Sequence, residues 1–197
     1  MKAETKSVLL VLTIWFCIAG VVGLTDIFNS ASASAVALTV WSLTALALLG
    51  CWKVPVLNRW MRLADSSALI ALHLTRFVGV YFLVLCRHGE LSCRFARPAA
   101  IGDIATAAGA AILLSWHRAL NRQSPRPAVL IWNTFGLFDI LFVVFNARRV
   151  GLTDWQGMAP LRTLPLMLLP TFLVPLIIAS HLIIFARVIK RRDTGGG

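Results

Sequence analysis

The sequence predicts an all-α fold, a bundle of six transmembrane helices with both termini in the cytoplasm. Of its 197 residues, 58% are hydrophobic and only 14% are charged, whereas a soluble domain averages about 25% charged residues. The charged residues also gather between apolar stretches of roughly 20 residues, the length that a helix needs to cross a bilayer. The gaps between these stretches are too short for a soluble domain. We therefore expect residues 1–197 to form a single integral membrane domain in the lipid bilayer.

Six apolar segments give the expected helices. They cover residues 7–25, 34–52, 66–86, 98–116, 128–147 and 161–186. The fourth and fifth start next to Pro98 and Pro127, which suit the first turn of a helix because the N–H that proline lacks would have no partner there. The first follows Lys2 and Lys6 as in a signal peptide, but its apolar run is longer than a signal region, so we expect an uncleaved helix. Residues 188–197 are expected to form a flexible cytoplasmic tail.

The distribution of Lys and Arg orients the chain, because cytoplasmic loops of membrane proteins are rich in both. With the N-terminus inside, twelve of the 19 basic residues fall in cytoplasmic segments and six on the opposite side. The arginines of the loop between the third and fourth helices argue against this orientation. The net charge of +11 is explained by loops held against anionic lipid, and we do not expect nucleic-acid binding.

The four cysteines predict no metal site, because they form no CxxC motif and have no histidine at the spacing of a zinc ligand. Cys86 and Cys93 flank the loop between the third and fourth helices. They are expected to pair only if that loop faces an oxidising compartment, and the sequence leaves this open.

Six polar residues lie inside the expected helices. They are His73, Arg76, Asp103, Asn133, Asp139 and His181. An ionisable residue at such depth costs at least a few kcal/mol, so it usually faces other helices or a wet cavity. Arg76 and Asp139 are both expected near the middle of the bilayer, and we predict that they pair, with Asp103 close by on the outer side. Helices three to six would then form a polar interior, with the first two packed around it.

Within that interior, His73 and Arg76 share a helix face because they are three residues apart. Asn133 and Asp139 do not share one, since six residues turn a helix by about 240° beyond one revolution. We therefore expect Asn133 to contact a different helix. The fourth helix is rich in small residues, which predicts close packing around Asp103.

The sixth segment contains Pro165, Pro170 and Pro175. Each interior proline removes a backbone hydrogen bond and kinks a helix, and the freed carbonyl groups need other donors. The pattern fits a structural bend. It also fits a discontinuous helix that lines a substrate cavity, as in transporters.

Three functions remain open. The polar cluster favours a carrier or binding protein for a small solute or for protons, and six helices are few for a transporter, which favours a homo-oligomer. His73 and His181, at similar depth on two helices, are alternatively expected to bind haem b as axial ligands. The third interpretation is a purely structural or interaction role. No HExxH or GxSxG motif appears, so the sequence favours a protein that is not an enzyme.

Four stretches carry a resemblance to a known group. They are RFVGVYFLVL, GELSCRFARPAAIGDI, WNTFGLFDI and PLMLLPTFLVPL, the last followed by His181. Together they resemble a family of short, uncharacterised bacterial multi-pass membrane proteins over roughly residues 70–185. The resemblance implies a location in the bacterial cytoplasmic (inner) membrane, and it implies no activity.

Overall fold

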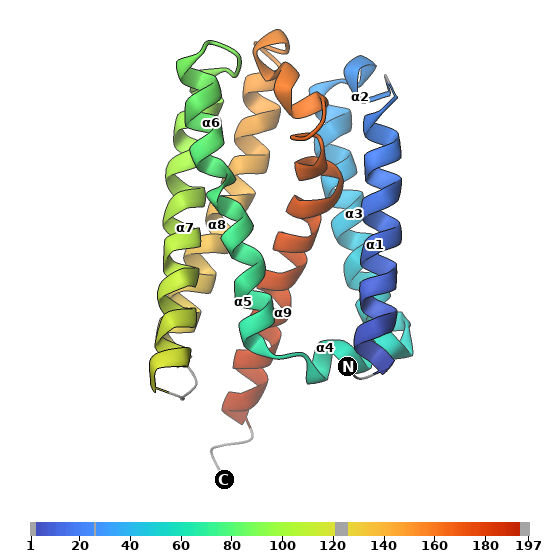
Figure 1. Ribbon diagram of the computed structural model, residues 1–197, viewed down its shortest axis with the longest axis vertical. Helices are drawn as coiled ribbons and strands as arrows, with labels where there is room; N and C mark the ends of the chain where they lie inside the picture. The colour runs from blue at the N-terminus through green and yellow to red at the C-terminus, as the bar shows by residue number, and fades with distance from the viewer. Residues whose placement is uncertain (1–2, 26, 121–125, 194–197) are drawn as a thin grey trace.

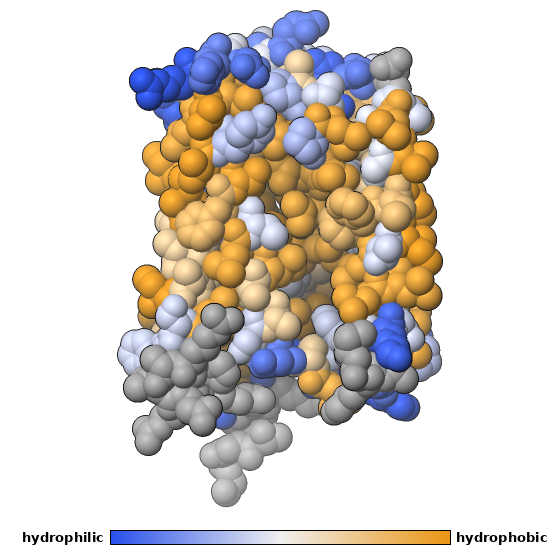
Figure 2. All heavy atoms as spheres, viewed as in Figure 1, coloured by the Kyte–Doolittle hydropathy of each residue, from blue (hydrophilic) through white to orange (hydrophobic). Residues whose placement is uncertain are grey.

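The computed structural model describes residues 3–25, 27–120 and 126–193, and this part of the chain is helical throughout, apart from the connecting turns. Six of its helices are long and apolar enough to cross a membrane. They span Glu4–Gly23, Ala33–Lys53, Ser66–Arg87, Cys93–Trp116, Arg126–Gly151 and Leu169–Val188. The structure thus has the predicted number of helices able to span a membrane, and Figure 2 shows the apolar band that they form below a polar end.

The helices stand side by side in one bundle (Figure 1). In chain order the elements are α1 (Ala3–Gly23), α2 (Ile27–Ser30), α3 (Ala33–Lys53), α4 (Pro55–Leu63), α5 (Ser66–Leu72), η1 (His73–Phe77), α6 (Val78–Arg87), α7 (Cys93–Leu120), α8 (Arg126–Gly151), η2 (Gln156–Arg162), η3 (Leu169–Leu173) and α9 (Val174–Asp193). The start of α1 and the end of α9 lie at one end, here called the terminal end; the α6–α7 loop lies at the other, here called the loop end. Within the tail predicted for residues 188–197, α9 continues to Asp193, and residues 194–197 lie outside the described residues.

The third span is not one regular helix. A 3₁₀ segment, η1, interrupts it between α5 and α6 and carries both His73 and Arg76. The tighter 3₁₀ turn places residues i and i+3 on one line, so the predicted common face of these two side chains is retained. Mid-helix 3₁₀ stretches often mark functional hinges.

Pro98 lies inside α7, which begins at Cys93, and so it is not in the first turn as predicted. Its missing N–H would have bonded the carbonyl group of Arg94, four residues earlier. The side-chain amide of Asn146, from α8, donates to that carbonyl instead at 3.4 Å. Five alanines of α7 have no exposed surface, which confirms the close packing predicted for this helix; they are Ala96, Ala99, Ala100, Ala107 and Ala110.

The sixth span begins later than predicted. Residues 156–162 form η2, turns follow, and the span starts with the π-helical turn η3. Pro165 therefore lies outside the helix and does not kink it, whereas Pro170 lies in η3 and Pro175 in the first turn of α9. The carbonyl group of Thr171, which Pro175 leaves without its helical donor, accepts a hydrogen bond from the Trp15 indole of α1 at 3.0 Å. The Trp15 indole thus satisfies a carbonyl group that the break in the helix would leave without a donor, as hydrocarbon surroundings require.

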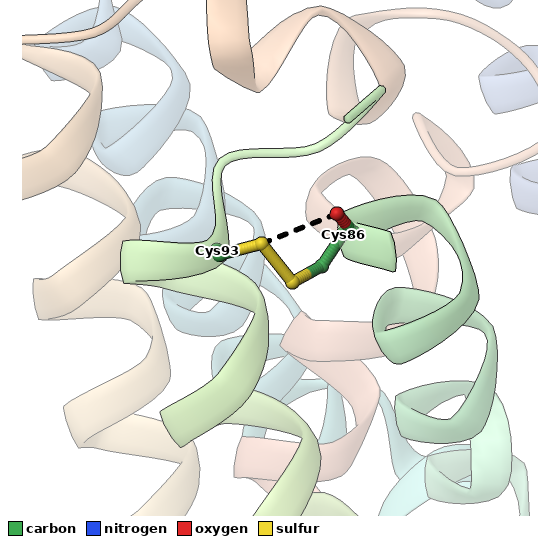
Figure 3. The surroundings of a disulfide bond; sticks show 2 residues. All are labelled: Cys86 and Cys93. Carbon is green, nitrogen blue, oxygen red and sulfur yellow. Dashed lines mark hydrogen bonds between the residues drawn. A yellow bond between two sulfur atoms is a disulfide. The ribbon is translucent and has the colours of Figure 1, made fainter. Parts of the chain in front are cut away.

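At the loop end, Cys86 lies in the last turn of α6, Cys93 is the first residue of α7, and a disulfide joins them (Figure 3). Gly89, with φ 75°, supplies the left-handed residue that turns the chain back. The contact of 3.2 Å between the Cys93 sulfur and the Cys86 carbonyl oxygen is van der Waals contact, since a disulfide sulfur carries no hydrogen. The pairing that the sequence left open is therefore present in the structure.

Candidate functional site

Arg76 is the centre of a buried charged cluster. Its side chain is 1% exposed, and its Nε donates to Asp103 Oδ1 at 2.7 Å. One terminal nitrogen donates to the carbonyl oxygen of Gly136 at 2.9 Å, and the other donates to Asp139. The predicted pairing of Arg76 with Asp139 is confirmed, and Asp103 is a second, equally direct partner. We refer to Arg76, Asp103 and Asp139 as the charged cluster.

Glycines on α6 and α7 make room for the charged cluster. A Cβ atom on Gly102 of α7 would collide with the carboxylate of Asp139, so α7 and α8 approach as closely as they do only because this residue has no side chain. Gly79 does the same for α6, because a Cβ there would lie 3.0 Å from the Ala100 backbone and 3.1 Å from the Asp103 Cβ. The close approach brings acceptor groups of α7 and α8 within hydrogen-bond distance of the guanidinium on η1.

The charges of the cluster do not balance. With both carboxylates ionised, one guanidinium faces two negative charges, and the three groups together carry a formal charge of −1. A single bidentate carboxylate would neutralise Arg76. A net charge away from water is costly, so the cluster is neutral only when it also holds one proton or one further cation.

A second polar group, the histidine pair, lies beside the charged cluster. The rings of His73 and His181 have centroids 4.1 Å apart, and both residues are fully buried. The side-chain amide of Asn133 forms hydrogen bonds with both the ring and the backbone carbonyl oxygen of His181 on α9. Asn133 therefore does contact a different helix from Asp139, as predicted. Gly136 lies between the two groups, because its carbonyl oxygen contacts Arg76 and a Cβ on it would lie 2.6 Å from the His181 ring.

The hydrogen bonds of the histidine pair determine which ring nitrogens carry hydrogen. The Ser180 hydroxyl donates to the Ile177 carbonyl oxygen at 2.8 Å, so it must accept from His73 Nε2, 3.0 Å away. The Asn133 amide nitrogen donates to the His181 carbonyl oxygen, so the amide oxygen accepts from His181 Nδ1 at 2.8 Å. His73 Nδ1 and His181 Nε2 are then bare acceptors, and neither has a hydrogen-bond partner within the described part of the chain.

This arrangement does not fit haem. Two axial imidazoles bind iron from opposite faces of the macrocycle, and rings with centroids 4.1 Å apart leave no space for it between them. No group of three or more His, Cys, Asp or Glu residues that could hold a metal ion occurs among the described residues.

Sequence reasoning missed three residues of this site. Ser180 is buried and bonds His73, and Gly136 connects the two polar groups. Trp132 packs edge-on against His73 with ring centroids 5.0 Å apart, and its indole N–H donates to the Thr106 carbonyl oxygen at 2.9 Å. The sequence does contain a pattern that points to two of these residues, because Trp132 and Gly136 are four residues apart on the helix face that also carries Asp139.

A cavity of about 90 Å³ adjoins the charged cluster. Arg76 and Asp103 lie at its deep end, and Arg148 and Arg162 lie at its loop end. Its walls are otherwise almost entirely apolar and come from α3, α6, α8, η2, η3 and α9; they include Val40, Phe82, Ile140, Val143, Leu173 and Ile177. In the space-filling view, a hollow near the middle of this face lies between α6 and α9 (Figure 2). Two of the three residues of the charged cluster, Arg76 and Asp103, therefore line this cavity.

One comparison with known proteins gave a match. A family model described as "Domain of unknown function (DUF8737)" matches residues 33–189. This range begins at the first residue of α3 and contains the charged cluster, the histidine pair and the cavity. No curated protein and no solved structure matches the chain.

Proposed function

We propose that this chain, which belongs to the family described as "Domain of unknown function (DUF8737)", is a multi-pass membrane protein. It binds a small solute and couples this binding to a proton in the charged cluster. The family description supplies no activity, so the proposal rests on geometry. The observation that carries it is one buried guanidinium, Arg76, that has two carboxylate partners and that lines a cavity together with one of them, Asp103.

A purely structural role would not need the second carboxylate. An ion pair that only holds helices together is complete with one carboxylate, and each additional buried charge adds a desolvation penalty. The second acid becomes favourable when it is protonated, because the cluster is then neutral and the neutral acid can donate a hydrogen bond. A proton that enters or leaves the cluster changes its charge by one at the point where a solute in the cavity would sense it.

The histidine pair supports proton transfer between the cluster and the terminal end. His73 precedes Arg76 in a span that starts at the terminal end. His73 Nδ1 and His181 Nε2 both have a free lone pair, which is what a proton acceptor requires.

We further propose that the protein lies in a bacterial inner membrane with its termini in the cytoplasm. A disulfide is stable in an oxidising compartment and rare in the cytosol, so the bond between Cys86 and Cys93 favours a loop end outside the cytoplasm. The count of Lys and Arg favours the same orientation. An impermeant thiol reagent applied to intact cells after reduction should label these two cysteines. If they are labelled only after the membrane is disrupted, the chain has the opposite orientation.

Infrared spectroscopy of the reconstituted protein tests the proton directly. At neutral pH we expect the C=O absorption of a protonated carboxylic acid, shifted when water is exchanged for D₂O. Asp103→Asn and Asp139→Asn should each remove this band, because the remaining carboxylate balances Arg76 alone. Asp65→Asn is the matched control, since Asp65 is exposed and caps the first turn of α5. A wild-type protein without the band, or a band that persists in both variants, would refute the proton-linked role.

A further inference from the structure

We infer that the ligand of the cavity is a single-chain amphiphile with an anionic headgroup. The headgroup would lie at the loop end beside Arg148 and Arg162, and the chain would extend along the apolar walls toward the charged cluster. This inference rests on the proposed function in one respect, namely that the cavity is the binding site.

The shape of the cavity sets the size of this ligand. Its wall on α3 extends from Ala33 to Val40, and its wall on α8 extends from Ile140 to Arg148. Seven or eight helical residues correspond to roughly 10–12 Å at 1.5 Å per residue. A space of this length and about 90 Å³ accommodates one narrow chain. It is too small for both chains of a membrane phospholipid, and its apolar walls offer no partners to a sugar or an amino acid.

The charge at the loop end identifies the headgroup. Arg162 is 8% exposed, and it donates to the carbonyl oxygens of Asn29 and Trp155 at 2.9 and 3.0 Å. It also lies over the Trp155 ring, 4.6 Å from its centroid. All these partners are neutral, its Nε has no hydrogen-bond partner, and among the described residues no carboxylate forms an ion pair with it.

Arg148, which is exposed at the same end, likewise has no ion pair within the described ranges. The contrast with Arg76 is informative, because Arg76 is neutralised by two acids while the two loop-end arginines retain their charge. A cavity with apolar walls and an uncompensated positive end complements an apolar chain with a negative head.

The chain can reach the cavity from the bilayer. Val78 and Phe82 of α6 and Pro170 and Leu173 of η3 line it, and the hollow of Figure 2 lies on this side of the bundle. These residues are apolar, so an alkyl chain passing between them leaves one hydrocarbon environment for another. A water-soluble solute would gain nothing from this route.

Photoaffinity labelling in lipid nanodiscs tests the inference. The probes are decanoate and decanol, each with a diazirine near the end of the chain, and labelled peptides are mapped by mass spectrometry. We expect decanoate to label the wall segments 140–148 and 169–177 about tenfold more than decanol does, as one charge-assisted hydrogen bond of roughly 1.4 kcal/mol would give. Excess unlabelled decanoate should compete, and excess two-chain anionic lipid should not.

Two pairs of variants keep the result interpretable. Arg148→Gln should reduce the preference for decanoate, whereas Arg149→Gln should not, because Arg149 does not line the cavity and bonds Asn146 instead. Ala147→Phe fills the cavity near its loop end and should abolish wall labelling by both probes. Ala105→Phe, on an exposed face of α7, should leave labelling unchanged.

Three outcomes would overturn the inference: equal labelling by both probes, labelling only on lipid-exposed faces, or competition by the two-chain lipid. None of these outcomes depends on a proton in the charged cluster. The infrared band can therefore be absent while decanoate is bound, or present while it is not, so the two proposals fail separately.

Discussion

Replacing Gly102 by alanine adds one methyl group at the point where α7 faces Asp139. The three atoms nearest to a Cβ built there all belong to the Asp139 carboxylate, and even the farthest of them lies at 2.8 Å, well inside the ordinary separation of about 3.5 Å or more. The carboxylate must therefore move away, and its contact with Arg76 must lengthen or break.

The expected cost combines three effects. Overpacking a well-packed site costs about 1–3 kcal/mol. Loss of an ion-pair partner adds to this, although less than the 3–5 kcal/mol of a fully broken buried pair, because Asp103 remains 2.7 Å from Arg76. Alanine in place of glycine returns up to about 1 kcal/mol of helix propensity. We expect Gly102→Ala to lower the free energy of unfolding by about 2–3 kcal/mol.

Unfolding in mixed micelles with increasing SDS, followed by circular dichroism, measures this change. Gly20→Ala is the matched control, because a Cβ on Gly20 of α1 meets nothing within 4 Å; it should be neutral or slightly stabilising. Combining Gly102→Ala with Asp139→Ala removes the collision, so the glycine substitution should cost almost nothing in that background. If Gly102→Ala costs the same with and without Asp139, the proposed collision is not its cause.

The other predictions concern the ion pair, the disulfide and the loop end. Arg76→Gln should cost about 3–5 kcal/mol, because it leaves two buried carboxylates unpaired; Asp139→Asn in the same chain should recover part of this loss, and additive costs would show that the two residues are not coupled. Replacing Cys86 and Cys93 by serine should cost about 2 kcal/mol of stability; in a maleimide titration, denatured wild-type protein should react at two thiols before reduction and at four after it. Hydrogen bonds from Ser92 and from the Gly157 N–H, with Arg94 nearby, lower the pKa of Asp154 at the loop end. Since the folded-state pKa lies below the unfolded one, the stabilisation is present above the unfolded value of about 3.9 and is lost as the pH falls through the folded-state pKa. The hydrogen-exchange protection of residues 152–158, measured against the exchange rate of an unstructured chain at the same pH, should therefore fall in acid in the wild type, and Asp154→Asn should be less protected at neutral pH.

Much of the fold follows from local properties of the sequence. Length and hydropathy determine which segments can cross a bilayer, so all six spans were identifiable. The cost of burying charge singles out Arg76 and its acidic partners, because a guanidinium in hydrocarbon surroundings must find one. Approximate depth along each helix then sufficed to pair Arg76 with Asp139.

The tertiary structure decided what depends on contacts between spans. Depth alone could not show that Asp103 bonds Arg76 as directly as Asp139 does, because this depends on how closely α7 approaches α6 and α8. The break at η1 and the late start of the sixth span also escaped prediction. Apolar composition is the same in α-, 3₁₀- and π-helical turns, and partners distant in the sequence, such as Trp15 for Thr171, satisfy the freed carbonyl groups. The close, tilted packing of the His73 and His181 rings, which leaves no space for haem between them, likewise depends on how α9 packs against η1 and α8.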